Sequence, residues 1–140
     1  MSARIWLRGA ALLQGLGAVL HTLASQHRNA PSGDVAVFQV MQSYRFQIMG
    51  FDRTYWDFFR GYEVSITIVF AMLAVLMWQV GSLSNKRHAL PIVMTLLVAQ
   101  VLLDLASWNY FFAGPGVMGI LIILCLAIAA LDLQRSQHPV

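Results

Sequence analysis

The chain has 140 residues, of which 59% are hydrophobic and only 11% are charged, with a formal net charge of +3. About a quarter of the residues of a soluble domain are charged, so this composition, with a mean hydropathy of +0.67, excludes an ordinary soluble domain and predicts an integral membrane protein. The basic residues occur singly or in pairs at the ends of apolar runs. That distribution orients membrane helices and differs from a nucleic-acid-binding surface, so we expect the membrane as a partner and no nucleic acid.

The first apolar segment, residues 5–24, is long enough for a membrane-spanning helix, which needs about 20 residues. Gln14 and His21 are two helical turns apart and share one face, which we expect to point into the protein. Small residues, mainly Gly and Ala, favour close packing of this helix against others. Because polar residues interrupt the segment and no A-x-A site follows, we interpret it as a retained span and not as a signal peptide.

A polar turn at residues 25–33 is followed by a predicted amphipathic helix over residues 34–49. Asp34 is of the residue type that caps a helix start, and apolar side chains recur at helical spacing through the segment. It is too polar to span, so we expect it on the membrane surface or across the mouth of the bundle. An extended loop is the alternative interpretation.

The second span is predicted at residues 54–80. Thr54 and Asp57 have the spacing of a capping box, and the aromatic residues that follow are typical of the headgroup level of a bilayer. One acid, Glu63, lies just inside the apolar run. A carboxylate inside hydrocarbon must be neutral, paired or in a wet cavity, so Glu63 is a functional-site candidate.

Two further spans are predicted at residues 90–108 and 117–133, with a tight turn at residues 113–116 between them. Pro91 is expected near the first turn of its helix, where a missing N–H does no harm. The fold class predicted for residues 1–140 is therefore all-α: a single transmembrane four-helix bundle with an outer-facing amphipathic segment between the first two spans. The single cysteine, Cys125, lies in an apolar run and excludes an intrachain disulfide.

Charges in the short loops predict the orientation. Basic residues precede the first span, separate the second from the third and follow the fourth, whereas the loop at residues 107–116 carries no charge. By the positive-inside rule both termini are cytoplasmic. We expect a bacterial inner-membrane protein whose connection at residues 25–53 faces outward.

Three ionisable residues on three spans are predicted to share one layer. His21 and Asp104 fall three and four residues from the outer ends of their spans, and Glu63 is expected at a similar depth, roughly 5 Å into the membrane at a rise of ~1.5 Å per residue. They would form the polar floor of a pocket with the amphipathic segment as its lid. The structural alternative is a hydrogen-bonded network that only locks the bundle.

The functional interpretation is a small membrane isomerase or cyclase that uses acid–base catalysis on a lipophilic substrate. Glu63 and Asp104 are the predicted proton donor and acceptor, and His21 is their partner. The remaining candidates are expected to bind or position the substrate, a hydrophobic small molecule or lipid: Gln14, Trp56, Tyr62, Gln100, Trp108 and Asn109. The alternative is a non-enzymatic lipid-binding or accessory membrane subunit whose polar layer is structural.

Other classes have weaker support. One His and two carboxylates suit a three-ligand metal site, with His27 nearby, and His21 alone suits haem, but no paired ligand motif such as HxxH or CxxCH is present. We therefore expect no cofactor. An ion or proton carrier is disfavoured because the inner halves of the first three spans carry no acid. The oligomeric state is left open, a homo-oligomer included.

The stretch GFDRTYWDF, residues 50–58, followed by RGYE, resembles a motif of small bacterial four-span membrane proteins with a His at the end of the first span. That resemblance covers most of the chain and implies no activity. A weaker likeness is to the EXPERA superfamily, which includes sterol delta-8/delta-7 isomerase and the sigma-2 receptor. It implies that Trp56 and Glu63 occupy the aromatic and acid positions of a sterol-sized cavity, with Asp104 as a second acid. The third and fourth spans do not align with it by motif, and His21 has no counterpart.

Overall fold

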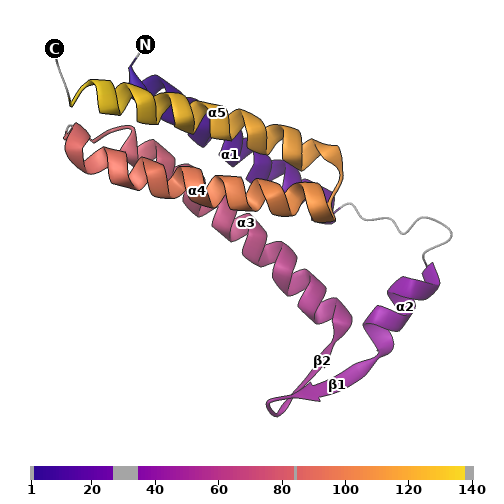
Figure 1. Cartoon of the computed structure of the whole chain (residues 1–140). Helices are drawn as coiled ribbons and strands as arrows, with labels where there is room; N and C mark the ends of the chain where they lie inside the picture. Colours follow the sequence, from indigo (N-terminus) through magenta and orange to yellow (C-terminus); the bar gives the residue numbers. More distant parts are fainter. Residues whose placement is uncertain (1, 27–34, 84, 138–140) are drawn as a thin grey trace. The chain divides into compact units, whose positions relative to one another are not determined.

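The computed structural model describes residues 2–26, 35–83 and 85–137. Five helices and one hairpin follow in the order α1 (Ala3–Gln26), α2 (Val35–Ser43), β1 (Arg45–Ile48), β2 (Phe51–Thr54), α3 (Tyr55–Val80), α4 (Lys86–Tyr110) and α5 (Ala113–Arg135), as Figure 1 shows. They divide into two compact units: a first unit of residues 1–17 and 70–140, and a second unit of residues 18–69. Helices α1 and α3 each contribute to both units.

Three of the helices, α3, α4 and α5, are long and apolar enough to cross a membrane. This confirms the prediction of an integral membrane protein with helical spans from residue 55 onward. Helix α1 forms as predicted but is not among these three, because Arg4, Arg8, Gln14 and His21 lower its hydropathy. Its crossing of the membrane therefore stays a prediction.

The first unit is built around one hydrophobic core to which four helices contribute. Its largest fully buried side chains come one from each helix: Leu7 of α1, Met77 of α3, Val93 of α4 and Leu126 of α5. At one end, the backbone N–H of Ala3 donates to the Asp132 carboxylate over 2.6 Å, which joins the start of α1 to the last turns of α5.

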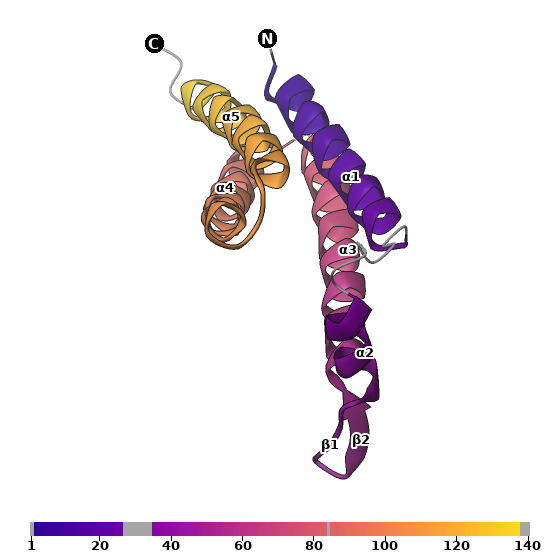
Figure 2. The same ribbon diagram turned by 90° about the vertical axis from the view of Figure 1, so that its right-hand side faces the viewer.

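Helices α4 and α5 form an antiparallel pair and lie side by side in both Figure 1 and Figure 2. The link between them is Phe111 and Phe112 alone, because α5 already begins at Ala113. The predicted turn at residues 113–116 is therefore wrong: these residues form the first turn of α5. Pro115 fits there because the first N–H groups of a helix have no partner inside the helix.

Helix α4 begins four residues before the predicted start of its span. The side chain of Asn85 accepts a hydrogen bond of 3.0 Å from the backbone N–H of Arg87 and caps the helix. Pro91 consequently lies inside α4 and not in its first turn. The predicted start was based on hydropathy, which rises where a helix enters the membrane. The helix itself begins earlier, at its cap.

The second unit contains a hairpin that the sequence prediction missed. The chain is mostly helical, as predicted, but helix α2 ends at Ser43, so the predicted helix over residues 34–49 is wrong from residue 45 onward, and residues 45–54 depart from the all-α class. Met49 and Gly50 have φ angles of 49° and 83°, and two adjacent residues with positive φ make the tight turn typical of two-residue hairpins. The predicted cap, Asp34, lies outside the described residues.

The ring of Phe46 holds the hairpin against the start of α3. It lies 5.0 Å from the ring of Tyr55 and 5.6 Å from that of Phe58, measured between centroids. Phe46 makes these contacts from a strand that returns toward α3. The contacts therefore favour a strand paired with β2 over a continuation of helix α2. Helix α3 itself opens with the predicted capping box, in which Thr54 N–H donates to Asp57 and Asp57 N–H donates to Thr54 Oγ1, over 2.8 and 3.1 Å.

Candidate functional site

Three buried polar side chains in the first unit each have one oxygen atom without a hydrogen-bond partner. Gln14, Gln100 and Asp104 are only 2%, 6% and 8% exposed, and each has a buried side-chain oxygen with no partner. Most buried polar groups are paired, and leaving one unpaired costs about 1–3 kcal/mol. An acid and two carboxamides in this state form a buried polar region that lowers the stability of the fold.

The contacts of α5 place these three residues at one level of the unit. A Cβ on Gly9 would lie 3.9 Å from Cys125 Sγ, and one on Gly17 would lie 3.4 Å from Met118 Sδ, so α1 runs antiparallel along α5. Because the helices are antiparallel, each step back along α1 matches a step forward along α5. Gln14 is three residues before Gly17, so it lies level with residue 121, three residues after Met118.

The same reasoning applies to α4. A Cβ on Gly119 of α5 would overlap the carboxylate of Asp104, so Asp104 is level with Gly119. Gln100 lies one turn away on the same face of α4, level with residue 123. Gln14 therefore falls between the levels of Gln100 and Asp104, and all three occupy the buried faces of their helices.

Glycines on α5 allow this close approach. Besides Gly119 against Asp104, a Cβ on Gly116 would overlap the indole of Trp108. In membrane bundles small residues let helix backbones approach closely, and polar side chains then find room between them. Asp104 lies on an inward face of α4, as predicted, but its neighbour Gly119 was not predicted. The G-x-x-G spacing of residues 116–119 was the available signal.

Two residues predicted to bind or position the substrate, Trp108 and Asn109, make contacts of their own within the first unit. Trp108 is 49% exposed and packs its ring on Gly116. The side-chain amide of exposed Asn109 donates over 2.7 Å to the carbonyl of Leu105 in the same helix. Asn109 is therefore engaged by α4 itself, because an Asn near a helix end bonds the carbonyl four residues back.

In the second unit the predicted acid Glu63 is paired. It is 5% exposed, and its Oε2 lies 3.0 Å from the guanidinium of Arg60, one turn earlier on α3. Arg60 also donates over 3.1 Å to the backbone carbonyl of Ser25 at the end of α1. The three groups thus fasten α1 to α3.

His21 belongs to a second polar contact between the same two helices. Its Nδ1 lies 3.1 Å from Thr67 Oγ1 of α3, and Thr22 Oγ1 lies 3.3 Å from that same hydroxyl. Among the other predicted residues, Tyr62 is 68% exposed. Trp56 stacks on Phe59 at 5.6 Å and packs edge-on against Phe38, so it contributes to an aromatic cluster.

The predicted single layer is divided between the two units. Asp104 belongs to the first and His21 and Glu63 to the second, so their meeting around a shared pocket stays a prediction. None of the three lines the groove beside the hairpin or the groove at the start of α1. Within residues 2–26, 35–83 and 85–137 no group of three His, Cys, Asp or Glu side chains is arranged to hold a metal ion.

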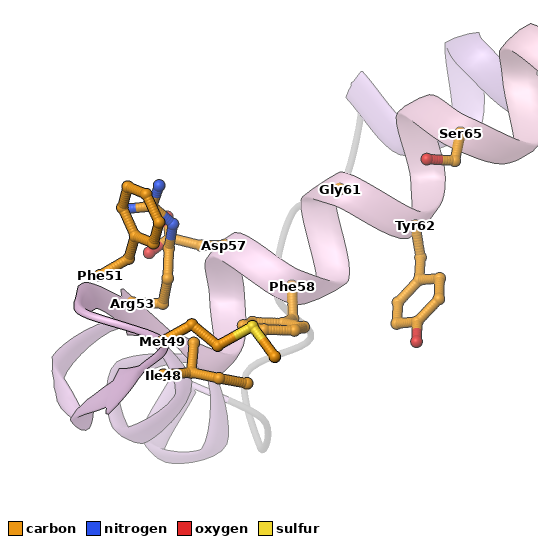
Figure 3. A pocket seen from close by; sticks show the side chains of 9 residues that line it. All are labelled: Ile48, Met49, Phe51, Arg53, Asp57, Phe58, Gly61, Tyr62 and Ser65. Atoms are coloured by element: carbon orange, nitrogen blue, oxygen red, sulfur yellow. The ribbon is translucent and has the colours of Figure 1, made fainter.

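The larger groove lies in the second unit, between the hairpin and the first turns of α3, with a volume of about 540 Å³. Figure 3 shows the side chains that line it: Ile48, Met49, Phe51, Arg53, Asp57, Phe58, Gly61, Tyr62 and Ser65. Sequence analysis assigned most of these residues to a helix or an aromatic belt. The pair Met49–Gly50 between two short segments was the signal for the hairpin that forms one wall.

The fold and these sites define a helical integral membrane protein with buried acids. No protein-family model, curated protein or solved structure matches this chain. Its function is therefore inferred from its own residues.

Proposed function

We propose that this protein is a small integral-membrane isomerase or cyclase that acts on a lipophilic substrate, with Asp104 as its acid and base. The observation that carries the proposal is the buried Asp104 oxygen without a partner, set at one level with the unpartnered oxygens of Gln14 and Gln100. Ionisable groups inside membrane helices are expensive and usually functional. Glu63, the other predicted acid, already has Arg60 as its partner, so the geometry favours Asp104.

The chemistry requires only one carboxyl group. The Asp104 carboxylic acid transfers its proton to one carbon of a double bond, and the π electron pair forms the new C–H bond. The cation left on the second carbon then loses a proton from the next carbon to the carboxylate, which moves the double bond and restores the acid. In a cyclisation, a second double bond attacks the cation and forms a C–C bond before that proton leaves. Carboxamide oxygens of Gln14 and Gln100 present partial negative charge, which stabilises the cation.

The proposal includes a transmembrane four-helix bundle in which α1 also crosses. The packing of Gly9 and Gly17 on α5, and the bond from Ala3 to Asp132, support α1 as a partner of α5 over its first half. The distribution of basic residues supports cytoplasmic termini and an outward-facing hairpin in a bacterial inner membrane.

The second candidate is a non-enzymatic lipid-binding or accessory membrane subunit whose polar groups are structural. The paired contacts of the second unit favour it, because Arg60, Glu63 and Ser25, like His21 and Thr67, join two helices. Under this candidate function Asp104 would also join helices, with a hydrogen-bond partner supplied by another subunit or by water.

Deuterium transfer distinguishes the two candidates. We would reconstitute the full-length protein into vesicles made from membrane lipids of the organism that produces it, in D₂O, and compare lipid masses with time. Acid catalysis through Asp104 leaves a C–D bond in the product, and Asp104→Asn should lower its rate by at least about 100-fold, since general acid–base catalysis contributes factors of that size or more.

Asp52→Asn is the matched control, because Asp52 is an exposed acid of the hairpin and outside the proposed site. It should leave the rate unchanged. Equal deuterium incorporation by wild type and Asp104→Asn, or none by the folded wild type, would refute the isomerase or cyclase and leave the accessory subunit.

A further inference from the structure

The hairpin of the second unit has one apolar and one polar face. Directly paired residues lie on the same side of a sheet, and successive pairs alternate. The pairs Ile48 with Phe51 and Phe46 with Arg53 therefore share one face, and the pairs Gln47 with Asp52 and Arg45 with Thr54 share the other. Apart from Arg53 the first face is apolar.

The tip of the hairpin is also apolar. Met49 is 95% exposed and has a positive φ of 49°. Asn or Gly is usual at such a position, and a non-glycine residue there costs about 1–2 kcal/mol. A strained, fully exposed Met flanked by the exposed side chains of Ile48 and Phe51 is favourable only where the surroundings are themselves apolar.

The groove connects this apolar face to the membrane helix. Its second wall consists of residues that recur along one face of α3: Asp57, Phe58, Gly61, Tyr62 and Ser65. From Asp57 to Ser65 the helix advances by eight steps, or roughly 12 Å at ~1.5 Å per residue. Since α3 is a candidate span that begins at Tyr55, the groove extends from the headgroup level into the hydrocarbon.

Gly61 leaves room in the middle of the groove. A Cβ built on it would have no atom within 4 Å, so the backbone of α3 is bare at this point. An extended chain can therefore lie against the helix between Phe58 and Ser65 (Figure 3).

The outer end of the groove carries a cation. The guanidinium of Arg53 lies 5.3 Å from the centroid of the Phe51 ring, and its NH1 donates over 2.8 Å to the carbonyl of Asp52. These contacts orient the group while most of its five N–H donors remain available for an anion. The other charged residue of the groove, Asp57, accepts a hydrogen bond from the backbone N–H of Thr54 in the capping box and also interacts electrostatically with Arg53.

We propose that this groove is a binding site for an anionic phospholipid, with the phosphate at Arg53 and one acyl chain along α3 past Gly61. The cation at the headgroup end and the apolar walls below it match the two ends of such a lipid, and Arg binds phosphate through paired N–H donors. The apolar tip at Met49 inserts into the same leaflet beside the bound lipid. This inference stands independently of the isomerase or cyclase proposal.

Native mass spectrometry of the full-length protein, released from detergent with added phosphatidylglycerol or phosphatidylcholine, tests the headgroup. Arg53→Gln should weaken phosphatidylglycerol binding about tenfold, the factor that corresponds to losing one charge-assisted contact. Arg45→Gln is the matched control, because Arg45 lies on the opposite face of the hairpin. It should change binding less than twofold. Equal effects of the two variants, or equal binding of the two lipids by wild type, would overturn the proposal.

The acyl-chain site has its own test. Gly61→Phe introduces a ring into the groove at a position where an added Cβ meets no atom within 4 Å, and it should abolish binding of both lipids. Val64→Phe is its control, since Val64 is exposed on α3 and does not line the groove. Unchanged lipid binding in Gly61→Phe would reject the chain site. A dimer that Gly61→Phe dissociates would instead assign the groove to a second copy of the chain.

Discussion

Gly119 of α5 lies directly against the carboxylate of Asp104, and this single contact sets the depth of the proposed catalytic acid in the first unit. A side chain at position 119 would displace Asp104 or separate α4 from α5. The glycine therefore has a packing role, and the acid depends on it for its place at the level of Gln14 and Gln100.

Gly119→Ala should destabilise the protein by about 1–3 kcal/mol, because an added methyl group in a filled interface forces neighbours to move. Thermal unfolding in detergent, followed by circular dichroism, measures the change. Gly61→Ala is the matched control: its Cβ meets no atom within 4 Å, and exchanging Gly for Ala inside a helix stabilises by up to about 1 kcal/mol.

The pair of variants Gly119→Ala and Asp104→Ala extends this test. If the overlap with the carboxylate is the cause, removing the carboxylate should recover part of the lost stability, so the two changes would be non-additive. Additive losses would show that Gly119 is constrained by something other than Asp104.

At the scale of elements, the hairpin depends on its two-residue turn. Gly50 has a φ of 83°, in the left-handed region where residues other than glycine are strained. The aromatic contacts of Phe46 with Tyr55 and Phe58 then hold β1 against α3. The turn and these rings together explain why residues 45–48 pair as a strand and do not continue α2.

Gly50→Ala should weaken the hairpin by about 1–2 kcal/mol, the cost of a Cβ in the left-handed region. Hydrogen exchange of the backbone amides at residues 45–54 should accelerate, whereas exchange in α4 and α5 should not change. Met49→Asn, which suits a positive φ, should slow exchange in the same residues. Exchange unaffected by either substitution would contradict the assigned turn.

At the scale of the whole molecule, three apolar helices make the chain an integral membrane protein, and the charge distribution predicts its orientation. Positive charges lie in the first two turns of α1, begin α4 and end α5. Residues at both ends of the chain are therefore expected inside the cell and the hairpin outside.

Single cysteines test this orientation in the Cys125→Ala background. A membrane-impermeant maleimide added to intact spheroplasts should label Gln47→Cys, on the polar face of the hairpin, and leave Gln137→Cys unlabelled, and inverted vesicles should give the opposite pattern. Labelling of both positions from one side would mean that the number of crossings between them is even, so that α3, α4 and α5 do not all cross the membrane.

The sequence by itself determined the membrane class, the approximate ranges of three apolar helices, the capping box of Thr54 and Asp57, and the inward location of Gln14, Gln100 and Asp104. Hydropathy and helical periodicity are local properties, so they can be read without knowing which segments meet. Only the tertiary structure decided that residues 45–54 form a hairpin, that Glu63 pairs with Arg60 and joins α1 through Ser25, and that Gly119 lies against Asp104. Those outcomes depend on contacts between segments distant in the sequence or on competition between local conformations. Packing decides such outcomes, whereas the periodicity of a sequence does not contain them.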